Sequence, residues 1–342
     1  MRHRLTIDAF PGFNEIDLAA FRIKFLAGVV DRVVIAECHL TQSGNTKPLY
    51  FSKWLSSCEF DLRERVEIII PPLSRVSTNW EREIFTREFL SNYLYSQYPN
   101  AFFILSDLDE IPSLEQVEAM KSTPGIYHFK TPTFYRKSNW LLSDKHLDWQ
   151  RGVVGEVKYL PKLTNGGRFE SLPLIEASPG AHLSYFGADS NTIAQKYKAF
   201  AHTDLDKVHF SDRHLLDFCD YFRIDHLGRS RSRAFGLFHL IKPRENKVAD
   251  QISKDYPQHY DPGTDIPNSL LRIYASIYLS SYVRDSFLSE RKRILFKPSF
   301  YFGSQVAMFI LPPLVEIFMS FALNFAREIR NVTKNLLRKL TK

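Results

Sequence analysis

Apolar residues over the first 136 positions alternate between short continuous runs and helically spaced stretches. The continuous runs are RLTIDAF, RVVIAEC, RVEIIIPPL, AFFILSD and GIYHFKTPTFY, which begin at residues 4, 32, 65, 101 and 125. Between the first four lie three stretches with helical spacing: NEIDLAAFRIKFLAG, LYFSKWLSSCEF and NWEREIFTREFLSNYLYSQY. Because the continuous runs are apolar almost throughout, the pattern predicts parallel strands that are buried under helices on both faces.

The pattern is less regular beyond residue 136. HLSYFG, which starts at His182, predicts a short strand, and SNTIAQKYKAFAHT, which starts at Ser190, predicts a helix. The chain becomes helical in pattern again after about residue 268. We therefore predict an α/β domain over residues 1–262 and a helical extension over residues 263–342. The sheet of the α/β domain is expected to be doubly wound and mostly parallel.

Three acidic residues follow the fourth apolar run, in FFILSDLDEIPS: Asp107, Asp109 and Glu110. Ligands of parallel sheets bind beyond the carboxyl ends of the strands, which is where these acids fall. Their hard oxygen atoms suit Mg²⁺ or Mn²⁺, which keep coordination positions for water and substrate phosphates. The alternative is helix capping, but Ser113 and Gln116 already supply a capping box for the helix SLEQVEAM. The acids therefore predict a metal site.

Composition and charge limit the ligands and the cellular compartment that we expect. The formal net charge of +7 suits an anionic ligand or an anionic membrane surface. Three widely spaced cysteines predict no disulfide framework and favour a reducing compartment. The first residues contain no apolar run that resembles a signal peptide or anchor, so we expect a cytoplasmic protein. The sequence contains no glycine-rich phosphate loop, which counts against a nucleotidyl or phosphoryl transferase, and we expect no nucleic-acid partner.

The C-terminal residues suggest contact with a membrane surface. Residues 298–326 carry a single charged residue, Glu316, and Pro312 and Pro313 interrupt this apolar stretch. After the interruption, apolar residues from Leu314 to Leu340 form one helical stripe, with Lys and Arg on the other faces of its later half. This pattern is typical of an interfacial helix on anionic lipid. The alternative is a helix that packs on the domain or on a partner. We expect a peripheral protein on the cytoplasmic face of a membrane.

Several collinear blocks resemble glycosyltransferase family 17. SDLDEIP, from Ser106, looks like the family's signature, and GAHLSYFGADSNTIAQKYKAFAHTDLD, from Gly180, is similar to a later block around Gly-x-His-x-Ser. WEREIFTREFL has the family's Trp-x-x-Glu-x-x-x-Arg spacing at Trp80, Glu83 and Arg87. The N-terminal block matches at Asn14, Glu15, Asp17, Arg22, Asp31, Glu37, Thr41, Gly44, Lys47 and Pro48.

The resemblance implies an inverting GT-A transferase that uses a nucleotide sugar, typically UDP-GlcNAc, with Mn²⁺ or Mg²⁺. The acceptor would be a glycan or a lipid-linked glycan. This sequence differs from the family at two points, which concern the cellular location of the protein and its acceptor. We expect no counterpart of the membrane anchor found at the N-terminus of Golgi members, and Ala181 stands where many members have Trp before the His. A non-catalytic binding protein that keeps the GT-A shell is the other alternative, and intact Asp107, Asp109 and His182 count against it.

Carried onto this chain, the resemblance implies roles at the metal. Asp109 would bind the ion, and His182 would complete the metal site, the alternative being a polar residue at a strand end. Asp107 would contact the ribose of the donor or a metal-bound water. We assign catalytic roles to Asp107, Asp109, Glu110 and Asp189. The general base is not singled out by the sequence; Asp189, Glu156 and Glu170 are the candidates.

Donor-binding roles fall on residues of the N-terminal block and of the third predicted helix. Asn14 and Glu15 would lie near the base or ribose, although Asn14 also suits the N-cap of the first helix. Glu37 is a further donor-binding candidate. Glu83 and Arg87, four residues apart, would line the pocket with Asp107, or would form only a surface ion pair.

Overall fold

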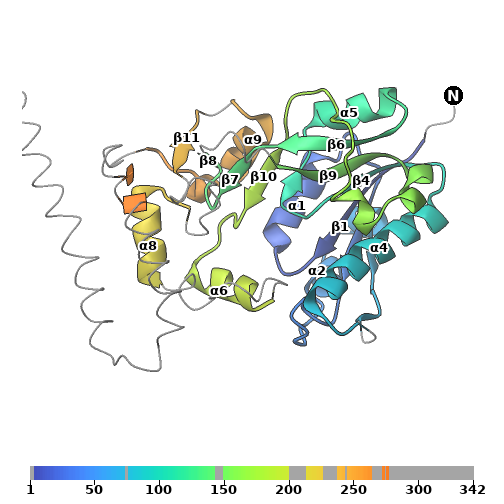
Figure 1. Ribbon diagram of the computed structural model, residues 1–342, viewed down its shortest axis with the longest axis horizontal. Coiled ribbons are helices and arrows are strands. Elements are labelled where there is room, and N and C mark those ends of the chain that lie inside the picture. The colour runs from blue at the N-terminus through green and yellow to red at the C-terminus, as the bar shows by residue number, and fades with distance from the viewer. Residues whose placement is uncertain are drawn as a thin grey trace, which may run out of the picture.

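The computed structural model describes residues 4–73, 76–142, 149–199, 213–225, 237–242, 245–263, 272–273 and 275–276 (Figure 1). Almost all of the extension predicted for residues 263–342, including the stretch expected at a membrane surface, therefore lies outside the described residues. Within the described part of the chain, no helix combines the length and the apolar character needed to cross a bilayer.

Four parallel strands form one side of a six-stranded sheet. They are β1 (Thr6–Gly12), β2 (Arg32–Glu37), β3 (Val66–Ile69) and β4 (Phe102–Leu105). The connecting helices are α1 (Ile16–Phe25), α2 (Tyr50–Ser56), α3 (Phe60–Arg65) and α4 (Asn79–Gln97). The strand order is β3-β2-β1-β4-β9-β6. β2 and β3 lie on one side of β1 and β4 lies on the other, so the strand order reverses between β1 and β4. The strands and helical stretches predicted from the first 105 residues are confirmed, except that the second stretch ends earlier, as α2, and a separate helix that was not predicted, α3, follows it.

The far side of this sheet is not parallel. β9 (Trp149–Glu156) lies antiparallel between β4 and β6 (Ile126–Thr131), because the chain enters it after visiting a second sheet. Two glycines let β9 fit there. A Cβ on Gly152 would lie 2.1 Å from the Phe129 ring, and one on Gly155 would lie 2.6 Å from the carbonyl oxygen of Gly125. The sheet is therefore mixed, and the prediction of a mostly parallel sheet holds for its first four strands.

Helices cover both faces of the sheet, as predicted, because successive strand residues point to opposite faces. Ile7 and Ala9 of β1 pack against Leu90 of α4 on one face. Phe10 belongs to the core on the other face, together with Phe21 of α1. α1 and α4 therefore pack on opposite faces of β1.

A second sheet of five strands lies beside the first (Figure 1). Its order is β11 (Phe238–Leu240), β8 (Trp140–Leu142), β7 (Thr133–Tyr135), β10 (Ala181–Ser184) and β5 (Glu110–Ile111). The strand predicted at His182 is β10. β5 begins at the third of the acids, Glu110, which pairs with His182 of β10. The acidic turn therefore joins the two sheets.

The remaining described helices complete the two layers. They are α5 (Leu114–Ser122), α6 (Ser190–Ala199), α8 (Arg213–Phe222), α9 (Lys247–Asp255) and the short 3₁₀ segments η3 (Val157–Lys162), η4 (Asn165–Gly167) and η5 (Pro257–His259). Ser113 and Gln116 form the predicted capping box of α5. The start of α5 is therefore capped by its own residues, without the three acids upstream.

Candidate active site

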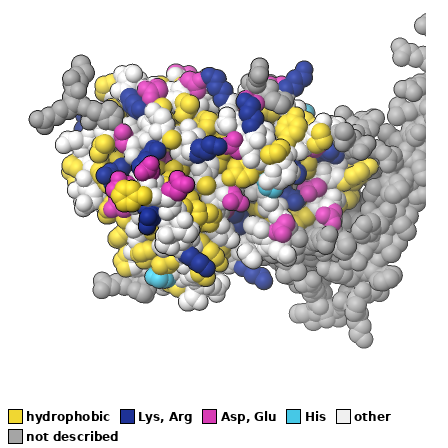
Figure 2. Space-filling view, turned by 180° about the vertical axis from the view of Figure 1, so that it is seen from behind, with side chains coloured by type: hydrophobic (Ala, Val, Ile, Leu, Met, Phe, Trp, Pro, Cys, Tyr) yellow, Lys and Arg dark blue, Asp and Glu magenta, His cyan; other side chains and the backbone are white. Residues whose placement is uncertain are grey.

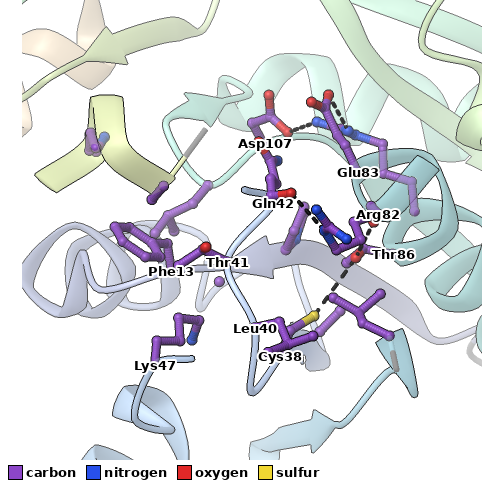
Figure 3. Close-up of a pocket in the computed structure, with 18 of the residues that line it drawn as sticks. Phe13, Cys38, Leu40, Thr41, Gln42, Lys47, Arg82, Glu83, Thr86 and Asp107 are labelled. Carbon is purple, nitrogen blue, oxygen red and sulfur yellow. Dashed lines mark hydrogen bonds and ion pairs between the residues drawn. The ribbon is translucent and has the colours of Figure 1, made fainter. Parts of the chain in front are cut away.

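A cavity of about 250 Å³ opens beyond the carboxyl ends of β1, β2 and β4, where the strand order reverses (Figure 3). Its wall comes from the loops after these strands, from the first turns of α4 and from α6. Leu40 and Cys38 lie at the opposite end of the lining from Asp107 and Glu83. The charged lining residues are Lys47, Arg82, Arg87, Arg168, Lys196, Glu15, Glu83, Asp107 and Asp109.

Asp107 lies in a chain of alternating charges. Arg87 forms ion pairs with Asp107 and, at 2.7 Å, with Glu83. Arg168 contacts the other carboxylate oxygen of Asp107 at 2.6 Å and Glu110 at 3.1 Å. Arg87 and Glu83 line the cavity with side chains that are only 5% and 14% exposed. The alternative of a surface ion pair is therefore wrong for these two residues.

The two guanidinium groups keep Asp107 ionised. Burial by itself would raise the pKa of this carboxyl, but Arg168 and Arg87 outweigh burial and hold its pKa well below the ordinary value. In turn, Asp107 and Glu110 raise the pKa of Arg168 despite the burial of that side chain. Because both carboxylate oxygens of Asp107 already contact arginines, this residue is less suited to binding a metal than Asp109 is.

Glu110 does not line the cavity, and its side chain has no exposed surface. Its carboxylate accepts hydrogen bonds from Arg168, from the indole nitrogen of Trp149 and, at 3.0 Å, from the backbone amide of Asp107. Glu110 therefore fixes the acidic turn and Arg168 from beneath. This geometry differs from the direct catalytic role predicted for it, since a substrate cannot reach a fully buried carboxylate.

Asp109 and His182 face each other, with 3.6 Å between Oδ2 and Nε2. β10 brings them together, because the Leu183 amide donates to the Asp109 carbonyl at 2.7 Å. Nδ1 of His182 lies 3.4 Å from the Thr133 hydroxyl, and the imidazole lies beside the Trp149 ring, with 5.0 Å between the ring centroids. Burial would raise the pKa of Asp109, but His182, together with Lys196, outweighs burial and lowers it.

These two side chains fit an ion that keeps open coordination positions. In the described ranges, no cluster of three His, Cys, Asp or Glu side chains has the geometry to bind a metal. A closed structural zinc site needs four protein ligands, whereas Mg²⁺ and Mn²⁺ accept one or two and keep water and phosphate oxygens. Asp109 and His182 can supply such a pair at the edge of the cavity, so the predicted site is compatible with the geometry.

Glu15 and Lys196 close one side of the cavity. Glu15 precedes α1, and its carboxylate lies 2.6 Å from Nζ of Lys196 on α6. Glu15 also occupies the N-cap position of α1, where no side chain makes a capping hydrogen bond. The alternative that Asn14 caps this helix is therefore wrong. Asn14 lies outside the cavity lining, and its buried Oδ1 has no hydrogen-bond partner among the described residues.

Glu37 has no exposed surface and supports the cavity from behind. Its carboxylate accepts the backbone amides of Phe51 and Ser52 at 2.7 and 2.8 Å, which satisfies the start of α2. Nζ of Lys47, which lines the cavity, lies 3.9 Å from Glu37. Glu37 thus positions α2 and Lys47, and a direct contact with the donor is excluded by its burial.

The candidate general bases lie elsewhere. Asp189 accepts the Thr192 amide at 2.8 Å at the start of α6, and this hydrogen bond lowers the pKa of its carboxyl. Glu156 pairs with Arg4 and Lys158, each at 2.9 Å. The Glu170 carboxylate accepts from a nearby threonine. Asp189, Glu156 and Glu170 are all absent from the lining of the described cavity, whose acids are Glu15, Glu83, Asp107 and Asp109.

Comparison with known proteins adds a decisive observation. Residues 2–224, which include every site residue described above, match the family model for glycosyltransferase family 17. The chain belongs to glycosyltransferase family 17. The beta-1,4-mannosyl-glycoprotein 4-beta-N-acetylglucosaminyltransferases of Homo sapiens and Rattus norvegicus are each 31% identical to it over 131 residues. That alignment covers 36% of this chain and 24% of each relative, so the chain aligns with about a quarter of their length.

A solved structure is also similar in part. The crystal structure of HddC from Yersinia pseudotuberculosis covers 53% of this family 17 chain and 91% of its own. The TM-score is 0.32 and the sequence identity is 12%, a likeness too slight to bear on the site.

Sequence reasoning missed Arg168, Lys196 and Trp149 in this family 17 site. Arg168 follows Asn165, Gly166 and Gly167, whose φ angles are all positive. This left-handed turn presses against the end of β4, since a Cβ on Gly166 would lie 2.6 Å from the Leu105 side chain. The Asn-Gly-Gly triplet predicts a tight turn, but the sequence does not indicate that the arginine after this turn contacts Asp107.

Proposed function

We propose that this protein is an inverting glycosyltransferase of the GT-A type, which transfers GlcNAc from UDP-GlcNAc to a hydroxyl of a glycan or lipid-linked acceptor. The observation that carries the proposal is the charged cavity at the carboxyl ends of β1, β2 and β4 in a chain that belongs to family 17. The family match and the names of the partly aligned relatives support sugar transfer to a glycan.

The cations of the cavity support a diphosphate-containing donor. Arg87, Arg168 and Lys196 line one cavity and present guanidinium and ammonium groups, which form strong charge-assisted bonds to phosphate oxygens. As the bond from the sugar to the diphosphate breaks, negative charge grows on the departing diphosphate. Fixed cations stabilise that charge without reorganising, which lowers the barrier. Phe13 and Leu40 supply apolar surface to the same lining, which suits a nucleobase.

Asp109 and His182 are the residues that would hold a Mn²⁺ or Mg²⁺ ion. When bound, the ion supplies additional positive charge beside the leaving diphosphate. Asp107, held by Arg87 and Arg168, would keep these two guanidinium groups aligned and accept a hydrogen bond from the donor or from water. Because Glu110 is buried, its proposed role is to hold Asp107 and Arg168 in position.

Incubation with a panel of nucleotide sugars, with and without Mn²⁺, tests the proposal through nucleotide release. We expect release from UDP-GlcNAc that depends on the metal. Release of nucleotide monophosphate or pyrophosphate would instead indicate a nucleotidyl or phosphoryl transferase, and binding without release would indicate a non-catalytic protein. In calorimetric titration, UDP should bind more tightly with Mn²⁺. Another nucleotide that binds tenfold tighter would contradict the donor assignment.

We also propose that the enzyme acts on the cytoplasmic face of a membrane, where it would meet a lipid-linked or envelope glycan. The support for this comes from the sequence of residues 298–342, in which an interrupted apolar stretch precedes a basic amphipathic segment.

A further inference from the structure

A buried ion pair joins β1 to α1 beneath the active site. Nε and Nη2 of Arg22 donate to the two carboxylate oxygens of Asp8 at 2.8 and 2.6 Å. Both side chains have no exposed surface, and Asp8 lies in β1 between the core residues Ile7 and Ala9. Removing two charges from water costs several kcal/mol per ion, so an apolar pair would serve the core as well or better. The pair therefore calls for an explanation other than stability.

The remaining hydrogen bonds of Arg22 all go to the acidic turn. Nη1 donates to the backbone carbonyl oxygens of Asp107, Leu108 and Glu110 at 2.8, 3.2 and 3.1 Å. Nη2 also donates to the Ser106 hydroxyl at 2.9 Å. One guanidinium thus gathers three carbonyls of a single short turn.

These contacts lie on the inner side of the turn. Buried carbonyl groups must find donors, and Arg22 donates to three of them, two of which, on Asp107 and Glu110, also accept from the Ser106 hydroxyl. With the carbonyls held inward, Asp107 and Asp109 line the cavity on the outer side. The planar fork of arginine can serve Asp8 and the turn at once, whereas the single ammonium of a lysine cannot cover both.

We propose that Arg22, oriented by Asp8, is a positioning residue that fixes the backbone of the turn 106–110 and so aims Asp107 and Asp109 at the donor and its metal. Arg22 does not line the cavity, so it acts only through the turn. The proposal rests on the proposed function, because the turn has to be aimed only if its acids handle a donor. It goes beyond that function by giving the buried Asp8–Arg22 pair a task in catalysis.

Two variants of the full-length chain separate positioning from stability. Arg22→Lys keeps the charge next to Asp8 and loses the fork. The double variant Asp8→Leu/Arg22→Met removes both charges, since Arg22→Met alone would leave Asp8 buried without its partner. We expect both variants to lower kcat by about a hundredfold, because a misplacement of about 1 Å has that effect. The double variant should nevertheless fold, because the Ser106 hydroxyl still donates to the Asp107 and Glu110 carbonyls, and its melting temperature should lie only somewhat below that of the parent, since the Leu108 carbonyl loses the donor that Arg22 supplied.

Amide hydrogen exchange provides a readout that does not depend on turnover. The amide of Asp107 donates to the Glu110 carboxylate and the amide of Glu110 to the Asp107 carbonyl, each at 3.0 Å. Faster exchange at these two amides is expected in both variants. Arg223→Lys is the matched control, since Arg223 forms a buried pair with Asp261 beside the second sheet. It should lower the melting temperature and leave kcat and exchange in the turn unchanged.

The proposal is overturned if the double variant keeps the parental kcat, or if amide exchange in the turn of either variant matches that of the parent. A parent that releases nucleotide from none of the nucleotide sugars would overturn the proposed function instead. In that case exchange at Asp107 and Glu110 still decides whether Arg22 fixes the turn.

Discussion

Two aspartates two residues apart have different partners in this protein. Asp107 is held by two arginines, whereas Asp109 faces His182 with a side chain that is 21% exposed. Asp109→Ala should lower transfer by at least about a hundredfold, because it removes the group best placed to bind a metal. The melting temperature should change little, since the side chain lies at the rim of the core.

Asp250→Ala is the control for that substitution, since Asp250 forms an ion pair with Lys254 at 2.9 Å on the surface of α9. Measurements of transfer and of Mn²⁺ affinity would compare the two variants. Full activity of Asp109→Ala, or of the parent in EDTA, would rule out a metal at this place.

The low pKa of Asp107 predicts how stability depends on pH. A carboxyl whose pKa is depressed by folding stabilises the folded state above its unfolded pKa of about 3.9, and this contribution disappears as the pH falls through the folded pKa. The contribution should therefore be constant between pH 7 and 5. Arg168→Gln removes one of the two cations that depress the pKa, so the folded pKa of Asp107 rises towards its unfolded value and the loss of stability on acidification should be smaller than in the parent. Thermal unfolding from pH 7 down to pH 3 would detect the smaller loss, and an equal fall in melting temperature for parent and variant would contradict it.

The sequence revealed those site residues whose position follows from regular structure. Asp107 and Asp109 follow an apolar strand, so their place at the strand end could be inferred from the pattern, whereas a pocket role for Glu83 and Arg87, one helical turn apart on α4, came from the resemblance to family 17. The roles assigned to all of them stay predictions. Arg168 could not be located, because an irregular turn with positive φ angles positions it and no periodicity encodes that path.

At the scale of elements, α6 closes the cavity from the side of the second sheet. Its last carbonyls accept hydrogen bonds from the loop after β2: Ser43 donates its amide to Ala199 at 3.0 Å and its hydroxyl to Lys198 at 2.5 Å. Lys196 reaches across from the same helix to Glu15. The helix thus brings a cation to a cavity otherwise built by the first sheet.

Lys196→Met should raise the KM for UDP-GlcNAc by about tenfold, which corresponds to ~1.4 kcal/mol of lost binding. The physical reason is the loss of one ammonium group from the proposed phosphate site. Lys198→Met is the matched control, because Lys198 is exposed on the same helix. Steady-state kinetics of both variants at saturating Mn²⁺ would compare them. Equal KM values would show that Lys196 serves only to hold α6.

The secondary-structure elements likewise divide into those that the sequence predicts and those that it does not. Continuous apolar runs predicted β1 to β4, and helical spacing predicted α1, α2 and α4, because burial of the sheet under helices on both faces imposes these patterns. β9 escaped prediction: WQRGVVGE carries polar residues and two glycines, and its antiparallel place between β4 and β6 depends on a chain path through the second sheet. Strands of three residues outside the predicted runs, such as β8 and β11, are too short to show a period at all.

At the scale of the whole molecule, deletion of residues 298–342 tests the proposed membrane contact. We expect the full-length protein to float with anionic liposomes, because basic residues near such a surface contribute roughly 1 kcal/mol each beside apolar burial. The truncated protein should remain soluble and retain release of nucleotide from the donor. Neutral liposomes serve as the control. If the full-length protein does not float, or if the truncated protein unfolds, the segment packs against protein instead.

The pairing of charges in the cavity also bears on how fast a donor arrives. The described lining holds five basic and four acidic side chains, an excess of one positive charge, and acidic and basic groups are likewise interspersed over the face in Figure 2. A cleft attracts a charged ligand from a distance only when one sign dominates it. In stopped-flow experiments without divalent ions, the association rate of UDP should therefore change by less than about threefold between 50 and 500 mM NaCl. Discrimination among nucleotides would then reside in how long each one stays rather than in how often it arrives.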